Sequence, residues 1–443
     1  MGWASEELSR IDLGDQRLNG RSVKLLERLS EKPTASIPAA CRGWAETVAA
    51  YRFLAQEEIE WRDILQPHVD CSLSRMRGQP VVLCIQDTTE LDFNGRGIDG
   101  LGPLSYAAQR GMYLHPTYAV TPERLPLGVL DAWMWAREAK DEQGERPGIV
   151  ESHRWIEGYE RIAERAVELP DTRLVYVADR EADILALMQR AHALGNPADW
   201  LIRAKHNRKL GAEDGKLWDR LAEAPVLGEL RFYLPPRPGR KGRNIVQPVR
   251  VLRVSLPAEE GGQFETTAIL AREINPPPGE KPLEWRLLTN REANTLAEAA
   301  ECVDWYRCRW EIEMFFNILK NGCKVEALQL SAMPRIELAL ALFMIIAWRI
   351  GYLMRLGRAC PEMDCEVVFD HEEWQAAWLV ARKPLPKTPP TLNDAIRLIA
   401  TFGGFLGRKG DGEPGAKSLW HGLQRVMDFA MGIRAAQEAE ICV

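Results

Sequence analysis

The first seventy residues have the spacing of amphipathic helices. On one predicted helix, Leu18, Leu25, Leu26 and Leu29 fall toward one side, and basic residues gather on the other. The basic residues recur at steps of four, three and four: Arg17, Arg21, Lys24 and Arg28. The pattern predicts a helix with a cationic face. An ordinary solvated face has the same pattern, so both a DNA-binding and a merely exposed surface stay open.

From about residue 71 the pattern changes to short runs of apolar residues. They predict buried strands near 81–86, 112–120, 127–135 and 174–178, followed by helices. The first of these strands runs into Asp87 and the last runs into Asp179. Because sites in α/β proteins assemble at the carboxyl ends of strands, we expect these two carboxylates to lie close together.

A third acidic residue lies in the segment WYRCRWEIEMFFNILKNG, which predicts a helix. Tyr306, Arg309, Glu313 and Lys320 follow one another at spacings of three, four and seven residues, which return to one helix face. A structural surface helix has no reason to select this mixture. A carboxylate that binds a divalent cation, flanked by cations that bind phosphate, would need it.

Asp87, Asp179 and Glu313 together predict a two-cation site. Mg²⁺ prefers carboxylate oxygens and takes the rest of its shell from water and phosphate. Two ions roughly 3.5–4 Å apart would activate a nucleophile and stabilise a leaving oxygen, which is the chemistry of phosphodiester cleavage. Taken singly, each acid can also be an ordinary strand-end or helix-surface residue. The charged residues at 180, 181 and 183 fit the flank of a helix start and are left outside the site.

These segments resemble the DDE transposases of bacterial cut-and-paste insertion sequences. The likeness is carried by the strand-Asp-Thr-Thr at Asp87, the Asp-Arg-Glu-Ala-Asp at Asp179 and the helix at Glu313, and more narrowly it is to the group with the Y-(2)-R-(3)-E-(6)-K signature. LGDQRLNGRSVKLLERLSEKP and GWAETVAAYRFL are similar to that group's end-binding region. SLWHGLQRVMDF is similar to its dimer-forming tail.

The resemblance implies an α/β fold with a ribonuclease-H-like catalytic core, an inserted β-rich subdomain and helical flanking domains. The 134 positions between the last two acids are too many for a plain core, and this interval contains short β-like runs divided by proline- and glycine-rich segments. We expect a DNA-end-binding domain over 1–70, a catalytic domain over 71–355 with the insertion at about 200–292, and a dimerisation domain over 356–443.

The implied activity is that of a transposase. It would bind transposon ends, cleave them by metal-dependent hydrolysis through a hairpin intermediate and join the 3′-hydroxyl ends to target DNA. Its cofactor would be two Mg²⁺ ions, with Mn²⁺ able to substitute. Its partners would be double-stranded DNA, both inverted-repeat ends and target, and a second copy of the chain in the DNA-bound complex. No membrane is implied, and the expected location is the bacterial cytoplasm, at the nucleoid when bound.

Roles for other residues also follow from the resemblance. Tyr306 and Arg309 would position the scissile phosphate, and Lys320 would hold a terminal phosphate or a flanking strand. Trp285 would receive a flipped base, although a tryptophan between two leucines can simply be core. Arg17, Arg21, Lys24 and Arg28 would recognise the transposon end. A basic cluster would contact phosphates near the active site, or would be a solvated loop: Arg203, Lys205, Arg208 and Lys209.

Composition changes this picture in two places. The 443 residues, 46% of them hydrophobic, allow two or three domains, but a net charge of −6 is unusual for a DNA-binding surface. Local distribution relieves the conflict, because residues 201–250 contain twelve Lys and Arg against five Asp and Glu. The longest apolar run, 338–348, is too short to span a bilayer and predicts a buried helix. The nine scattered cysteines favour reduced thiols over a disulfide framework or a zinc site.

Other classes of function remain open. A ribonuclease-H-type nuclease without strand transfer would share the three acids, but it would not need Tyr306, Arg309 and Lys320. A DNA-binding protein descended from a transposase would be expected to have lost one of the acids. A glycoside hydrolase with a carboxylate pair is disfavoured by the clustered basic residues. The apolar band of the last helix, 417–434, fits dimerisation or packing within the chain.

Overall fold

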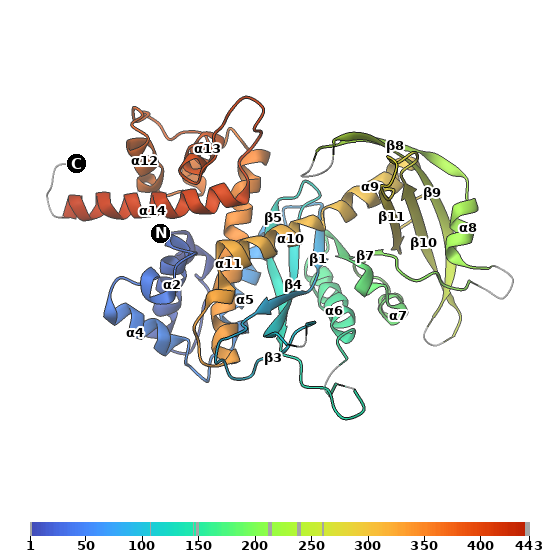
Figure 1. The fold of residues 1–443 in the computed structure, drawn as a ribbon, viewed down its shortest axis with the longest axis horizontal. Helices are drawn as coiled ribbons and strands as arrows, with labels where there is room; N and C mark the ends of the chain where they lie inside the picture. The colour runs from blue at the N-terminus through green and yellow to red at the C-terminus, as the bar shows by residue number, and fades with distance from the viewer. Residues whose placement is uncertain are drawn as a thin grey trace.

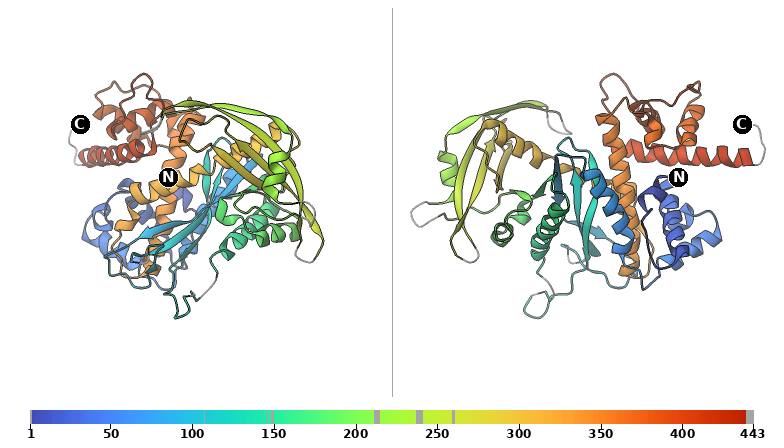
Figure 2. Two further views of the ribbon diagram at one scale, coloured as in Figure 1. Left: turned by 45° about the vertical axis from the view of Figure 1, so that its right-hand side comes forward. Right: turned by 180° about the vertical axis from the view of Figure 1, so that it is seen from behind.

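The computed structural model describes residues 2–106, 108–144, 146–147, 150–210, 215–236, 241–258 and 261–438. Two helical groups, one from each end of the chain, lie beside each other at one side of the molecule (Figure 1). A twisted sheet with its covering helices forms the centre and the opposite side (Figure 1). The view from behind shows the same arrangement, with the long helix α11 running between the helical groups and the sheet (Figure 2).

The N-terminal group consists of short helices that pack their apolar faces together. Asp15 caps the second of them by accepting a hydrogen bond from the backbone N–H of Arg17, which fixes where the cationic helix begins. Leucines 25, 26 and 29 of that helix are buried, which confirms the predicted amphipathic pattern. The helices are α1 (Trp3–Glu7), α2 (Gln16–Glu31), α3 (Ile37–Ala40), α4 (Trp44–Phe53) and α5 (Trp61–Met76).

The central sheet contains the four predicted strands, each within two residues of its predicted bounds. Its order is β5-β4-β1-β6-β7, in which β4 is antiparallel to β5 and β1, while β1, β6 and β7 are mutually parallel. Helices α6 (His153–Glu168) and α7 (Leu185–Ala193) and helix α5 cover this sheet. The strands are β1 (Val81–Gln86), β4 (Arg110–Val120), β5 (Pro126–Trp135), β6 (Arg173–Ala178) and β7 (Asp199–Arg203), with the short β2 (Thr89–Asp92) and β3 (Gly102–Pro103) paired to β4.

The β-rich segment extends the same sheet instead of forming a second one. Strand β11 pairs antiparallel with β7, and β10, β9 and β8 follow in order, which gives one sheet of 11 strands. The insertion therefore starts later than the expected position near 200, because β7 belongs to the core through its parallel pairing with β6. The added elements are α8 (Leu217–Glu223), β8 (Val226–Leu234), β9 (Arg243–Pro257), β10 (Gln263–Arg272) and β11 (Glu284–Thr289).

The segment expected to be one helix is divided. Helix α9 (Leu296–Arg307) ends in a tight turn, α10 (Trp310–Asn317) follows, and a π-helical turn, η2 (Ile318–Gly322), completes it. The short η3 (Val325–Ala327) leads into α11 (Met333–Ala359). Helix α11 is long and apolar enough to cross a membrane, but 83% of its most apolar window is buried inside the protein, as predicted for a core helix.

The C-terminal group packs on α11 and on the N-terminal group. It consists of α12 (His371–Val380), α13 (Leu392–Phe402) and α14 (Ala416–Glu438). The apolar band of α14 is buried mainly against α11, α12 and α13 of the same chain, which was the alternative to dimer packing. The expected boundaries at 70/71 and 355/356 fall inside α5 and α11, so these helices belong to two neighbouring groups at once.

Candidate active site

Two acidic residues leave the sheet at the same edge. Strands β1 and β6 are parallel neighbours in which Ile85 pairs with Val177. Asp87 and Asp179 each lie two residues beyond this pair, so they reach equivalent positions at the carboxyl end of the sheet. This placement confirms the prediction that the two strand ends are neighbours.

Arg309 joins this edge to the third acid. Its Nη1 donates a hydrogen bond to Oδ2 of Asp87, and its Nη2 donates to Oε1 of Glu313 at 3.3 Å. The backbone N–H of Arg309 donates to the carbonyl of Tyr306 at 3.0 Å, in the tight turn between α9 and α10. Through this turn, the sequence-distant residues Asp87 and Glu313 are held by one guanidinium.

The carboxylates influence one another electrostatically. Burial raises the pKa of Asp87 to about 7; Arg309 lowers it, while the negative charges of Asp179 and Glu313 raise it further. The Thr88 N–H donates to Oδ1 of Asp87 at 2.9 Å, and the Asp179 carboxylate accepts the N–H of Glu181 at 2.8 Å. A cation added here would relieve the mutual repulsion of the three acids.

The site accordingly has the chemistry of a divalent cation site, although its side chains are arranged around an arginine. Within the described ranges, no group of three or more His, Cys, Asp and Glu side chains is arranged to hold a metal ion. Three carboxylates are nevertheless the donor set that Mg²⁺ prefers. Burial is the main reason that the pKa of Asp87 is raised, and the charges of Asp179 and Glu313 add to it. The residues fit the metal if Arg309 leaves its position between Asp87 and Glu313.

An aromatic and cationic wall adjoins Arg309. The ring of Trp285 on β11 lies 5.6 Å from the ring of Tyr306 at an angle of 60°, and the guanidinium of Arg203 lies 5.1 Å from the Trp285 ring. In the described structure, the buried Tyr306 hydroxyl lies beside Arg203 without a hydrogen bond of good geometry. Burial raises the pKa of this phenol, while Arg309 and Arg203 lower it. The structure thus joins Trp285, Tyr306 and Arg203 in one wall beside Arg309, which itself contacts Asp87 and Glu313.

Lys320 lies apart from this group. It belongs to the π-helical turn η2, which changes the face that a regular helix would present. Its Nζ lies 3.7 Å from the carboxylate of Glu326, which also accepts the N–H of Asp92 at 3.0 Å. In the free protein Lys320 is tied to the start of η3, and its contact with DNA stays a prediction.

The basic loop after β7 is divided between exposed and buried cations. Lys205 and Lys209 are exposed, whereas Arg208 lies 2.5 Å from the fully buried carboxylate of Asp183. Asp183 also accepts the backbone N–H groups of Lys205 at 2.6 Å and His206 at 2.7 Å. Sequence reasoning placed Asp183 outside the site. Its place four residues after Asp179 was the only signal, and in the structure it pins this loop to the turn that begins at Asp179.

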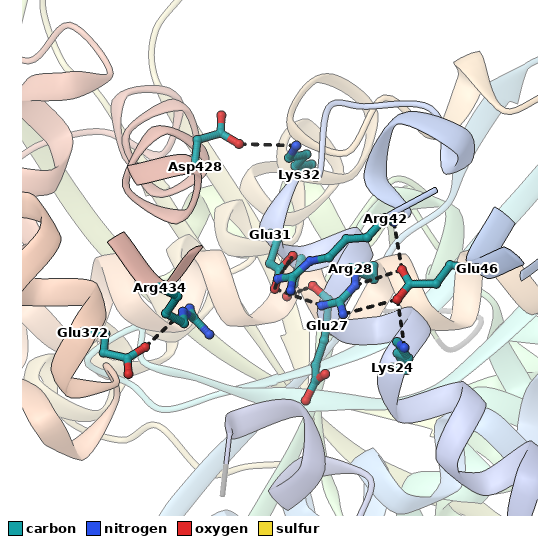
Figure 3. A network of polar contacts seen from close by, with 11 residues as sticks. Lys24, Glu27, Arg28, Glu31, Lys32, Arg42, Glu46, Glu372, Asp428 and Arg434 are labelled. Atoms are coloured by element: carbon teal, nitrogen blue, oxygen red, sulfur yellow. Dashed lines mark hydrogen bonds and ion pairs between the residues drawn. The ribbon is translucent and has the colours of Figure 1, made fainter. Parts of the chain in front are cut away.

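The cationic face of α2 is largely engaged within the N-terminal group (Figure 3). Lys24 and Arg28 both pair with Glu46 of α4, while Arg21 donates to the carbonyl of Ala49 at 3.4 Å. Arg17 is 90% exposed and, among the described residues, forms its ion pair with the capping residue Asp15. Figure 3 also shows Lys32, at the end of α2, paired with Asp428 of α14.

Comparisons with known proteins found three family models and a solved structure that resemble this chain. A family model described as transposase DNA-binding matches residues 1–59, one described as a transposase DDE domain matches 160–349, and one described as the transposase Tn5 dimerisation domain matches 345–441. A solved structure, the cryo-EM structure of the piggyBac transposase synaptic complex with hairpin DNA, is similar at 9% identity and a TM-score of 0.38, covering 98% of this chain and 77% of that one.

The chain therefore carries the DNA-binding, DDE and dimerisation domains of a transposase. The dimerisation model is the one described as Tn5, and together the three matches support a DNA-binding DDE transposase of the Tn5 type. Asp179 and Glu313 lie inside the segment matched by the DDE model, and Asp87 lies before it. The assignment of Asp87 thus depends on the geometry described above.

Proposed function

We propose that this transposase belongs to the Y-(2)-R-(3)-E-(6)-K group and performs hairpin-forming cut-and-paste transposition. The observation that carries the proposal is the contact of Arg309 with both Asp87 and Glu313 at the edge where β6 delivers Asp179. The strand order β5-β4-β1-β6-β7, with three antiparallel and then two parallel strands, suits a ribonuclease-H-like core. A DDE domain implies a divalent metal, for which Mg²⁺ is the expected ion.

Asp87, Asp179 and Glu313 would hold the metal ions. When bound, the ions supply an activated water and charge stabilisation at the leaving oxygen. Arg309 would exchange its two carboxylates for the scissile phosphate, to which a guanidinium can donate two parallel hydrogen bonds. Tyr306 would donate its otherwise unused hydroxyl to the same phosphate. Arg309 and Tyr306 are largely buried, and the lower local dielectric would strengthen their contacts with the phosphate.

Every step would be an in-line displacement at phosphorus. Water attacks the phosphate at the transposon end, a new P–O bond forms, and the bond to the 3′ oxygen breaks to leave a 3′-hydroxyl. This hydroxyl then attacks the opposite strand and closes a hairpin. A second water reopens the hairpin, and the regenerated 3′-hydroxyl attacks target DNA. Because the geometry at phosphorus is the same each time, one set of residues can serve all steps.

Trp285 would receive the base that leaves the duplex when the hairpin closes. Flipping a base costs a few kcal/mol, and stacking on an aromatic ring returns roughly 1–3 kcal/mol. In the free protein the Trp285 ring already lies against Tyr306 and Arg203, so an incoming base would stack beside groups that also reach the phosphate. Lys205, Lys209 and Lys320 would contact the flanking backbone.

The protein would act as a dimer on two DNA ends, in the bacterial cytoplasm and at the nucleoid. A DNA-binding protein without catalysis is the second candidate, favoured by the separation of the three carboxylates in the free protein. A third possibility is a nuclease without strand transfer. A joining assay distinguishes it from a transposase: pre-cut ends with free 3′-hydroxyls are supplied, and only a transposase joins them to a target plasmid.

The deciding experiment incubates the purified chain with Mg²⁺ and its own element's end fragments and resolves the products on a denaturing gel. We expect hairpin-ended fragments with the wild type and none with Glu313→Gln. Glu301→Gln on α9, a partly exposed acid in an ion pair with Arg291, is the matched control and should cleave normally. Equal cleavage by Glu313→Gln would refute the proposed site, and binding without any cleavage would favour the second candidate.

A further inference from the structure

The carboxylate of Glu46 is surrounded by donors from three sides. Lys24 Nζ lies 2.8 Å from Oε1, Arg28 Nε lies 3.1 Å from Oε2, and the backbone N–H of Arg42 donates to Oε2 at 2.8 Å (Figure 3). Arg28 Nη2 adds a longer contact of 3.5 Å to Oε1. Both oxygens of one anion are therefore bound by an ammonium, a guanidinium and a backbone amide.

This donor set is one that proteins use to bind phosphate. Guanidinium and ammonium groups and backbone N–H groups provide most contacts to the phosphates of bound DNA. A cavity of about 230 Å³ lies beside it, several times the roughly 30 Å³ of a water molecule. Arg21, Lys24, Arg28 and Glu46 line this cavity together with apolar residues of α2 and α4. The cavity gives a phosphate room to approach the cations from outside.

We propose that the cleft between α2 and α4 is a binding site for one backbone phosphate of the transposon end, and that Glu46 fills this site in the free protein. The inference rests on the proposed function, because end DNA supplies the ligand. On binding, the phosphate takes over Lys24 and Arg28, and Glu46 turns out into solvent from the first turn of α4.

The surroundings support an exchange of anions without rearrangement of the cations. Glu31 holds Arg28 at 3.2 Å and Arg42 at 3.1 Å from its other side, so Arg28 stays in place when Glu46 leaves. Burial raises the pKa of Glu46, but hydrogen bonds from Lys24, the Arg42 amide and Arg28 outweigh it and leave the pKa at about 2. Glu46 is thus a full anion at neutral pH and competes with phosphate there.

A purely structural ion pair predicts the opposite effect of neutralising Glu46. If the carboxylate only joins α4 to α2, its loss lowers stability and leaves DNA affinity unchanged or reduced. If it occupies a phosphate site, its loss raises affinity, because the phosphate no longer displaces a competing charge. The sign of the change in affinity therefore separates the two interpretations.

The test compares Glu46→Gln with wild type by fluorescence anisotropy of a labelled end duplex between 50 and 200 mM salt. We expect affinity to rise about 3- to 10-fold at the low-salt end, as for removal of one like charge near the phosphate. The slope of log K against log salt should change by less than about one unit, since each phosphate neutralised contributes about 0.9 and both proteins bind the same phosphates. Glu58→Gln, an exposed acid in the same matched segment, should change affinity less than 2-fold.

A second readout uses the wild type alone. Cys41 lines the cavity and is partly exposed, as are Cys71 and Cys360 elsewhere. We expect end DNA to protect Cys41 from alkylation, mapped by peptide mass, while Cys71 and Cys360 react as before. This readout decides the matter if thermal unfolding shows that Glu46→Gln does not fold.

The outcomes are distinct. Folded Glu46→Gln with equal or weaker affinity, or unprotected Cys41 in the DNA-bound wild type, would overturn the phosphate site while leaving the proposed function intact. A wild type that does not bind its end duplex at all would instead overturn the proposed function on which the inference rests.

Discussion

The active-site edge and the cleft between α2 and α4 balance their charges in opposite ways. At the edge, one arginine lies between two carboxylates, Asp87 and Glu313, with Asp179 nearby. In the cleft, one carboxylate, Glu46, lies among cations. The first region is left negative and suits metal ions, whereas the second is left positive and suits phosphate. The net charge of −6 therefore does not oppose DNA binding, because the two tasks fall to different regions.

Removing an acid from the active-site edge should have the largest effect, because it impairs this region and leaves the cleft unchanged. Asp87→Asn should lower single-turnover cleavage by about 10³-fold or more, as is typical when a residue of a cooperating catalytic set is lost. Affinity for end DNA should not fall, since the cleft is untouched. Asp171→Asn, an exposed acid in the turn before β6, is the control. Cleavage that survives Asp87→Asn would exclude this carboxylate from catalysis.

The next largest effect should come from the arginine that holds the acids together. Arg309→Met should lower cleavage about 10²-fold, because a charged contact to the phosphate is lost at the reacting centre. Arg307→Met at the end of α9, where Arg307 pairs with the exposed Asp304 and lies over the Phe232 ring, is the control and should leave cleavage close to the wild-type rate. A wild-type rate with Arg309→Met would assign the arginine to the free protein's charge balance alone.

Lowering the pH should affect the active-site edge and the cleft between α2 and α4 differently. The folded-state pKa of Asp87, about 7, lies above its ordinary value of 3.8. Its ionisation therefore lowers the stability of the folded protein as pH rises from about 4 to 7, and metal binding offsets this loss. The pKa of Glu46 is about 2, below its ordinary 4.5, so its contribution is present above pH 4.5 and is lost as pH falls towards 2.

Between pH 8 and 6, stabilisation of the protein by Mg²⁺ should therefore weaken while binding of end DNA stays constant. Thermal unfolding with and without Mg²⁺ measures the first quantity, and anisotropy measures the second. Asp87→Asn should remove most of the pH dependence of the stabilisation by Mg²⁺. Parallel decline of both quantities would contradict the division between the two regions.

The smallest effect is expected at Tyr306. Its hydroxyl is buried without a good hydrogen bond, so Tyr306→Phe should change stability by less than about 0.5 kcal/mol and lower cleavage about tenfold through loss of one phosphate contact. The control is Tyr159→Phe, where the lost hydroxyl donates to the Ala198 carbonyl at 2.7 Å. That change should cost about 1 kcal/mol of stability and leave cleavage unaltered.

The local sequence pattern predicted those features of the fold that residues close together in the chain determine. Mainly apolar runs marked β1, β4, β5 and β6, and the acids directly after two of them located the sheet edge. The five-residue strand β7 lies where the insertion was expected to start, and the sequence pattern gave no sign that it pairs parallel with β6. The regular spacing in the last acidic segment likewise gave no sign of the π-helical turn that diverts Lys320.

Partnerships between distant charges could not be read from sequence. The pattern that exposed Lys24 and Arg28 on one face of α2 contains nothing about Glu46, which arrives from another helix. Arg208 was counted with its basic neighbours, yet its partner is the buried Asp183. Which cations are free to meet DNA depends on such tertiary pairings, so the sequence predicts where the strand-end acids lie better than which partners the basic residues have.

The pairing of β7 with β11 fixes the distance between the active-site edge and the β-rich insertion. Neighbouring strands lie about 4.8 Å apart, so β6, which ends at Asp179, and β11, which carries Trp285, are held roughly 10 Å from each other with only β7 between them. A hinged insertion could drift with thermal motion, but backbone hydrogen bonds fix this spacing. If a DNA strand contacts both Asp179 and Trp285, the sheet would fix the distance between the position of cleavage and the unstacked base.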